Sequence, residues 1–300
     1  MDSPTTISAT GSNLIPKFGI LGSGFGMYGY APAVRQIGYP VLTLARYKDT
    51  LFARPELKKN LNDFIFFENE QDLIDQSDYL VIARQPSNQF RLVMDYIDNL
   101  ANKKHLFLEK PLSNSLVNSS IMLKLIEQEE IPFTVAYLFK YSAWFRLIHS
   151  AALETNHDIS IEWEIPRTSS DWKNSAPDGG GPLNFYGVHF LWMLIHFGVN
   201  PQFIKIKSGL DAFHISSNTS IKLSIFGRLV EGRGAFVIKD LSSEKLIFED
   251  ETPLGIRPSP GRADPRIDII AQYLEEQIES PPPKKQSLTT ERAIMSILLN

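Results

Sequence analysis

Short apolar runs alternate with helix-like stretches over the first half of this chain, and this alternation constrains its fold more than any other feature. The runs that predict strands lie at residues 18–21, 41–45, 64–67, 79–83, 105–108 and 132–137, and the helix-like stretches at residues 31–37, 70–76, 90–100 and 116–129. Strands that alternate with helices form parallel sheets through right-handed crossovers. The carboxyl ends of all the strands then share one edge, where open α/β folds bind ligands.

After about Tyr137 the pattern changes. Strand-like runs at residues 159–165, 203–206, 221–226, 235–238 and 245–248 have few helices between them; helices are predicted at 142–154, 183–197 and 267–278, and a proline break at 281–283 precedes a closing stretch, 289–299. Such runs predict an open, mostly antiparallel sheet. We therefore expect an α/β protein with an N-terminal Rossmann dinucleotide-binding domain, residues 17–137, and a C-terminal α/β domain, residues 138–300, for substrate binding and oligomerisation.

Composition narrows the class of protein further. The hydrophobic content of 43% can bury one large core or two moderate ones, and a net charge of −4 argues against a nucleic-acid surface. Because the chain has no cysteine, disulfides and thiolate chemistry are excluded. No apolar stretch is long enough to span a bilayer, and no cluster of acidic residues and histidines has metal-ligand spacing. We expect a cytoplasmic protein whose Ser/Thr-rich residues 1–16 form a flexible tail, with no metal and no membrane or nucleic-acid partner.

A glycine-rich turn follows the first predicted strand and comes before a predicted helix. It reads Gly22, Ser23, Gly24, Phe25 and Gly26. In a dinucleotide site the first glycine permits the tight turn, and the second lets the backbone approach the pyrophosphate. Met27 stands at the third glycine position of that fingerprint, and Gly26 or Gly29 would supply the close helix–strand contact. A turn without a ligand is the alternative reading, but the strand–turn–helix context favours dinucleotide binding.

The residue after the second strand bears on the choice of cofactor. An NAD site usually places Asp or Glu about 20 residues beyond the turn, on the ribose hydroxyls. This chain has Arg46 there, with Lys48 nearby. An arginine pairs with a 2′-phosphate, so we predict NADP rather than NAD. The alternative is a solvated surface arginine.

The fifth strand-like run, residues 105–108, ends in Leu106-Phe107-Leu108 and leads directly into Glu109-Lys110-Pro111. Proline has no N–H and stops a sheet ladder. The lysine is therefore expected to project from the carboxyl edge of the sheet, toward a bound nucleotide.

These motifs together resemble the Gfo/Idh/MocA oxidoreductase family over nearly the whole chain from Lys17. The resemblance rests on the Gly22 turn, Ala83-Arg84-Gln85-Pro86, Glu109-Lys110-Pro111, Trp172-Lys173, Gly179-Gly180-Gly181 and Gly187-x-His189. It implies hydride transfer between a nicotinamide and a sugar, nucleotide-sugar or polyol. It also implies a second domain whose open sheet often mediates assembly, so we expect a homo-oligomer, a dimer or a tetramer.

The resemblance also implies site residues. Lys110 would contact the substrate hydroxyl and the nicotinamide ribose, and His189 would act as acid/base. The remaining cofactor contacts would include Arg84, Gln85, Pro86 and Glu109, and the remaining substrate contacts Trp172, Asn184 and Tyr186. Simple packing is the alternative for Trp172, and a core histidine is the alternative for His189.

The chain departs from the family at an important position. The aspartate that usually stands four residues before the histidine is Phe185 here, and a second acidic position is Trp192. A neutral imidazole then lacks the carboxylate that would orient it and raise its basicity. Three outcomes remain open: His189 and Lys110 suffice, Asn184 or Tyr186 orients the substrate, or the chain binds NADP without turnover as a regulator. A reductase of a non-sugar imine or conjugated substrate is a further alternative.

Overall fold

The first of two sheets is parallel and has six strands in the order β3-β2-β1-β4-β5-β6. The computed structural model describes residues 15–58, 64–153, 158–167, 172–219, 221–255 and 261–299. Most of the predicted tail, residues 1–16, therefore lies outside the described residues. The strand order changes direction beside β1, which creates the crevice where such sheets bind nucleotides.

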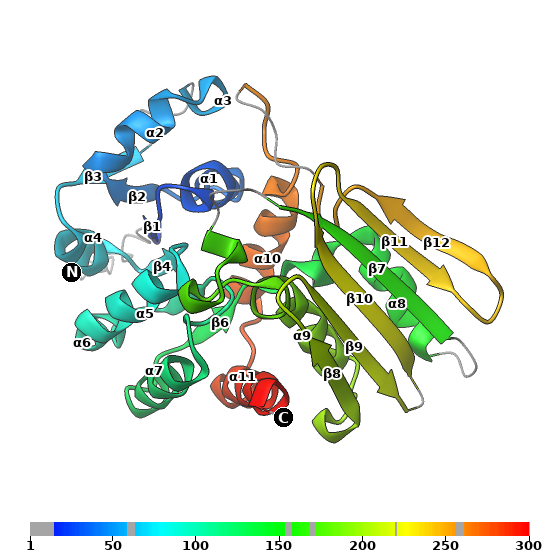
Figure 1. The fold of residues 1–300 in the computed structure, drawn as a ribbon. Coiled ribbons are helices and arrows are strands. Elements are labelled where there is room, and N and C mark those ends of the chain that lie inside the picture. Colours follow the sequence, from blue (N-terminus) through cyan, green and yellow to red (C-terminus); the bar gives the residue numbers. More distant parts are fainter. Residues whose placement is uncertain are drawn as a thin grey trace, which may run out of the picture.

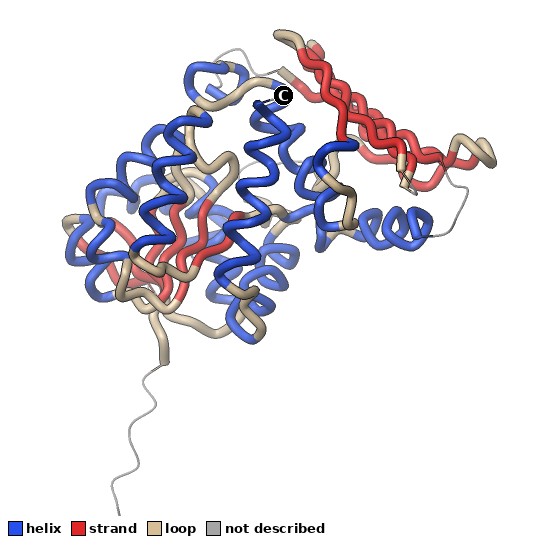
Figure 2. The backbone as a smooth tube through the Cα atoms, turned by 90° about the horizontal axis from the view of Figure 1, so that it is seen from below, coloured by secondary structure: helices blue, strands red, loops and turns tan. Residues whose placement is uncertain are grey.

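The elements of this half follow the predicted alternation. The strands are β1 (Phe18–Leu21), β2 (Val41–Leu44), β3 (Phe64–Phe67), β4 (Tyr79–Ile82), β5 (His105–Leu108) and β6 (Phe133–Val135); the helices are α1 (Ala31–Gln36), α2 (Lys48–Phe52), α3 (Pro55–Lys58), α4 (Glu70–Gln76), α5 (Pro86–Asp95), α6 (Ile97–Leu100) and α7 (Leu116–Gln128). Helices lie on both faces of the sheet (Figure 2). The strands β1, β2 and β5 are buried at every position, which explains why their sequences are apolar except for Thr43 and His105.

The second sheet is mixed, with six strands in the order β12-β11-β7-β10-β9-β8, and only its β7–β10 pair is parallel among the described strands. The strands are β7 (Asp158–Pro166), β8 (Ile204–Ser208), β9 (Ala212–Asn218), β10 (Lys222–Val230), β11 (Ala235–Asp240) and β12 (Lys245–Asp250). Helices α8 (Ala143–Leu153) and α9 (Val188–His196) pack on one face, and the other face is open (Figure 2). Buried and outward residues therefore alternate along β10.

The last two helices return to the first half of the molecule. Helix α10 (Ile267–Glu279) packs beside α1, and α11 (Lys284–Leu299) contacts α7, α9 and β6 (Figure 1). Buried side chains from both halves thus form one continuous apolar cluster.

The predicted fold class is confirmed, an α/β protein with a Rossmann sheet and an open, mostly antiparallel second sheet. Strand β9 was not predicted, because its outward positions carry His214 and Ser216 and only Phe213, Ile215 and Ser217 face inward. The proline break is present, but α11 begins at Lys284 rather than at residue 289. The helix expected at 90–100 begins earlier, with Pro86 in its first turn, and is divided into α5 and α6.

Candidate functional site

The glycine turn joins β1 to a helical segment that begins as a π-helical stretch, Gly26–Tyr30, and continues as α1. Gly22 has φ +157°, and a Cβ there would lie 2.2 Å from the carbonyl oxygen of Ala83. The turn therefore packs tightly against the end of β4. Only glycine permits this approach.

The tip of the turn has the opposite environment. Ser23 and Gly24 are exposed, and a Cβ built on Gly24 meets no atom within 4 Å. Open space above a glycine backbone, at the start of a helix and at the carboxyl edge of a parallel sheet, fits a pyrophosphate. The exposed backbone at Gly24 leaves room for a phosphate group at this edge of the sheet.

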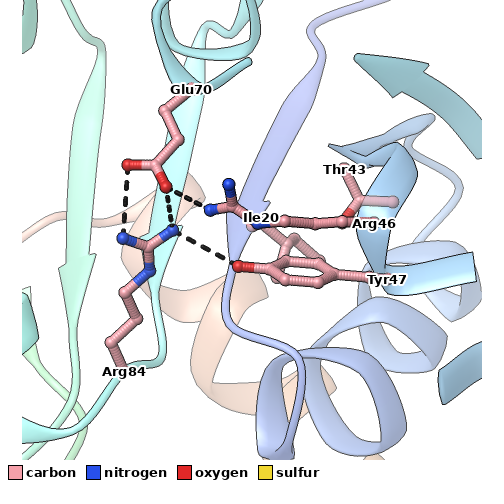
Figure 3. Close-up of polar contacts among 6 residues, drawn as sticks. All are labelled: Ile20, Thr43, Arg46, Tyr47, Glu70 and Arg84. Atoms are coloured by element: carbon pink, nitrogen blue, oxygen red, sulfur yellow. Dashed lines mark hydrogen bonds and ion pairs between the residues drawn. The ribbon is translucent and has the colours of Figure 1, made fainter. Parts of the chain in front are cut away.

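Arg46 lies at the end of β2, as expected, but it is paired with a carboxylate (Figure 3). Its partner is Glu70, the first residue of α4, which also accepts hydrogen bonds from Arg84 at 2.6 and 3.2 Å. Arg84 in turn donates to the Tyr47 hydroxyl at 3.3 Å. Burial alone would raise the pKa of Glu70, but its bonds to Arg84 and then Arg46 lower it. Two guanidinium groups share one carboxylate, so one positive charge remains uncompensated within this group.

Lys110 follows β5 at the carboxyl edge of the sheet, and its side chain is buried, with 9% of its surface exposed. Gln89 on α5 holds this loop, because its amide donates to the Glu109 carbonyl at 2.7 Å and accepts the Glu109 N–H at 3.0 Å. The Lys110–Pro111 peptide bond is cis. The lysine is thus fixed at its root by main-chain contacts.

Phe185 covers the end of the lysine. The Lys110 Nζ donates a 2.8 Å hydrogen bond to the Phe185 carbonyl and lies 3.3 Å from the centroid of its ring. Burial lowers the pKa of Lys110 to about 7; the Glu109 carboxylate opposes this shift, and the cations Lys173 and Arg266 add to it. The lysine is therefore an amine that changes charge near neutral pH.

His189 lies one turn further along, on α9, and is 5% exposed. Its ring stacks on Phe139 with centroids 4.2 Å apart. Burial lowers its pKa well below the ordinary value, and the charge on Lys110 lowers it further. Its Nδ1 is buried and has no hydrogen-bond partner among the residues that the structure describes. A neutral imidazole with an unpaired nitrogen can accept a substrate proton.

The other predicted site residues are distributed unevenly around Lys110. Trp172 and Tyr186 both contact the Phe185 ring edge-on, at centroid distances of 5.2 and 4.8 Å. Asn184 instead lines a separate cavity of about 60 Å³ with Pro111.

Three predicted cofactor contacts lie along the neighbouring strand ends. Gln85 is exposed before the first turn of α5, and Pro86 is buried in that turn. Glu109 accepts a 2.7 Å hydrogen bond from the Tyr30 hydroxyl.

Sequence reasoning missed Glu70 and Arg266. Glu70 begins α4 after β3, whereas Arg46 follows β2 and Arg84 follows β4, so their contact depends on which strands are neighbours. Arg266, which lies 4.3 Å above the Phe25 ring, comes from a loop more than 200 residues further along the chain, and no local pattern indicates this contact.

Within the described ranges, no group of three or more acidic residues and histidines is placed to hold a metal ion. Among the helices that the structure describes, none combines the length and apolar character needed to cross a membrane.

The chain therefore has a Rossmann-type sheet with a glycine turn at its carboxyl edge, and a second, open sheet. Residues 17–137 match the family model described as "Oxidoreductase family, NAD-binding Rossmann fold" of the Gfo/Idh/MocA group. This match covers the nucleotide-binding half of the chain and agrees with the resemblance seen there in the sequence.

Individual relatives are more distant. The chain is 26% identical over 154 residues to a glucose-6-phosphate 3-dehydrogenase of Bacillus subtilis, a match that covers 47% of this chain and 43% of that protein. The chain thus matches less than half the length of this curated relative. The WlbA (WbpB) dehydrogenase of Thermus thermophilus, solved with NAD and UDP-GlcNAcA, has a similar fold, with a TM-score of 0.67, 12% identity and 94% of each chain covered. A super-repressor mutant of Gal80p from Saccharomyces cerevisiae is similar at a TM-score of 0.65, 13% identity and 95% coverage of each chain.

Proposed function

We propose that this protein is an NADP-dependent oxidoreductase that transfers a hydride between nicotinamide and a sugar, nucleotide-sugar or polyol. The observation that carries the proposal is the position of Lys110. It is buried at the end of β5, on the sheet edge that holds the exposed glycine turn, and its charge acts on the unpaired imidazole of His189. A polar pair of this kind beside a dinucleotide cradle suits proton transfer to or from a reacting oxygen.

Lys110, His189 and the aromatic residues around them would each have a separate role in the reaction. When bound, the nicotinamide supplies or takes up the hydride. The cationic form of Lys110 would donate a hydrogen bond to the reacting oxygen in place of its bond to the Phe185 carbonyl. The unpaired Nδ1 of His189 would receive the hydroxyl proton during oxidation and return it during reduction. Trp172 and Tyr186 would exclude water from the site.

The cofactor proposal rests on charge. Arg46 keeps 55% of its side chain exposed while paired with Glu70, and Arg84 supplies a second guanidinium to the same carboxylate. The residual positive charge at the end of β2 suits a 2′-phosphate. The Arg46→Ala variant should then weaken NADPH binding by about 10- to 100-fold, the value of one or two charge-assisted hydrogen bonds, and change NADH binding much less.

The two halves of the chain would have separate tasks. We assign dinucleotide binding to residues 17–137, and substrate contacts and assembly to residues 138–300. The open face of the second sheet offers a surface for a dimer or tetramer, because it combines Phe226, 40% exposed, with the Arg228–Glu164 ion pair.

The test is a titration of the protein with NADPH and NADH, followed by turnover assays with a panel of sugars, nucleotide-sugars and polyols. Lys110→Ala should abolish turnover and leave NADPH affinity within about threefold. Tight NADPH binding without turnover of any carbonyl or carbinol would instead support a regulator. Turnover restricted to imines or conjugated substrates would support the non-sugar reductase, for which the Phe185 ring provides an apolar wall. Failure to bind either nucleotide would contradict all three.

A further inference from the structure

Arg266 brings a charge from the second half of the chain to the glycine turn. It directly precedes α10, and its guanidinium lies 4.3 Å above the Phe25 ring and 6.0 Å from the Tyr28 ring. Phe25 is the residue between Gly24 and Gly26, so Arg266 lies against the predicted pyrophosphate cradle. Helix α10 packs beside α1 (Figure 1), which brings these distant segments together.

A buried carboxylate fixes the direction of this arginine. Asp264 is 3% exposed and accepts hydrogen bonds from the Arg266 Nε at 2.8 Å and Nη2 at 2.6 Å. It also accepts the Arg266 main-chain N–H at 2.9 Å. A bidentate carboxylate sets the plane of a guanidinium, and the Tyr28 side chain is a further hydrogen-bond partner of Arg266.

The charge on Arg266 also reaches the opposite end of the site. It contributes to the lowered pKa of Lys110 and opposes the rise that burial causes in the pKa of Glu109. The charge on Arg266 likewise opposes the rise that burial causes in the pKa of Tyr30, whose hydroxyl donates to Glu109. The guanidinium therefore acts on both the glycine turn and the lysine, which are the two ends of the space that a nicotinamide mononucleotide half would occupy.

We propose that Arg266 is a cofactor-positioning residue, whose guanidinium contacts the pyrophosphate and which holds α10 against the nucleotide-binding half. This inference rests on the proposed dinucleotide function and extends it to a residue outside the Rossmann sheet. Burying an Asp–Arg pair costs desolvation energy, and binding an anion beside the arginine gives that pair a function that packing alone would not require.

The experiment compares Arg266→Gln and Arg266→Lys with wild type in calorimetric titrations. The probes are 2′-phospho-ADP-ribose, which contains the pyrophosphate, and adenosine 2′-monophosphate, which does not. Arg266→Gln should weaken the first probe by about 10- to 100-fold and leave the second within threefold. Arg266→Lys should recover part of the loss. The exposed pair-forming residue Arg292, on α11, provides a matched control, and Arg292→Gln should bind both probes as wild type does.

Other outcomes would overturn the inference. Equal binding of the pyrophosphate probe by wild type and Arg266→Gln would remove the contact while leaving the dinucleotide function intact. An equal loss for both probes would assign Arg266 a purely structural role. If Arg266→Gln does not fold, Asp264→Asn replaces it, and that variant must weaken the pyrophosphate probe selectively. Wild type that binds no dinucleotide would overturn the inference together with the proposed function.

Discussion

The Nζ of Lys110 is held by Phe185 in two ways, through a 2.8 Å hydrogen bond to its carbonyl and through its ring, whose centroid is 3.3 Å away. The sequence resemblance to the Gfo/Idh/MocA family predicts an aspartate at position 185, where this chain has phenylalanine. The main-chain carbonyl would be present with either residue, so the change at position 185 replaces a carboxylate with an aromatic face. The ring attracts the cation, but it cannot accept a proton from the substrate. Without a carboxylate at position 185, acid/base chemistry would depend on Lys110 and His189.

The Phe185→Asp variant tests this exchange directly. A carboxylate beside Lys110 and on the same helix face as His189 would raise the pKa of both and orient the imidazole. We expect kcat/KM for sugar oxidation to rise by about 10²-fold, the low end of general acid/base assistance. The control is Phe185→Asn, because asparagine has nearly the size of aspartate but carries no charge. Equal rates for the two variants would show that the ring, not the missing charge, limits turnover.

Lys110 should also impose a pH dependence on reduction. Burial lowers its pKa to about 7, so the cation that polarises a carbonyl is present below that pH and is lost above it. The rate of carbonyl reduction should therefore fall as pH rises through about 7. In Lys110→Arg the group stays charged, so the fall should disappear from the remaining activity. In His189→Gln the fall in rate with rising pH should persist. A pH profile unchanged in Lys110→Arg would assign the titration to another group.

Much of this arrangement followed from sequence, and the reasons are physical. The unbroken apolar runs of β1, β4 and β5 predicted a buried parallel sheet, and that sheet placed Gly24 and Lys110 on one edge. Local pattern could not show that Glu70 would hold Arg46 and Arg84, because ion pairing depends on which strands become neighbours. Nor could it show that Arg266 would reach Phe25, since the loop and α10 are positioned by packing between the two halves. Strand β9 was likewise not predicted, because the residues on its outer face are polar.

Glu70 should tune the choice between cofactors. Its carboxylate compensates one of the two positive charges at the end of β2. The Glu70→Gln variant keeps the shape but removes the negative charge and one of the two acceptor oxygens, so NADPH should bind about tenfold more tightly and NADH about equally. Fluorescence titration of both nucleotides at low ionic strength measures this preference. An increase in NADH affinity of the same size would show that the charge does not act on the 2′-phosphate.

The two glycines of the turn should respond differently to alanine. At Gly24 the added methyl meets no atom within 4 Å, so stability should change by no more than about 0.5 kcal/mol. The methyl would occupy the approach to the pyrophosphate, and NADPH affinity should fall at least tenfold. At Gly22 the methyl would lie 2.2 Å from the Ala83 carbonyl oxygen, so unfolding free energy should fall by about 1–3 kcal/mol. Denaturant melts and titrations on both variants separate the two effects.

Glu291 on α11 makes the stability of the fold depend on pH. It is 5% exposed, and the Tyr137 hydroxyl donates to its Oε2 at 3.1 Å. Burial raises its pKa to about 8, although the hydrogen bond from Tyr137 opposes the shift. The folded state then binds a proton that the unfolded chain releases near pH 4.3. Between about pH 4.3 and 8 the folded state holds more protons, so stability must fall as pH rises.

Replacing Glu291 with glutamine should remove this loss, because an amide fills nearly the same volume and does not ionise. Urea melts at pH 5, 7 and 9 should give wild type and Glu291→Gln nearly equal free energies of unfolding at pH 5. The variant should gain an advantage on the order of 3–5 kcal/mol at pH 9, since each unit of pKa shift corresponds to about 1.4 kcal/mol. Glu275→Gln, on the exposed face of α10, controls for the change in net charge and should follow wild type. Parallel stability curves for wild type and Glu291→Gln would mean that the carboxyl is ionised in the folded protein, and that water or a neighbouring cation reaches it through the α11 packing.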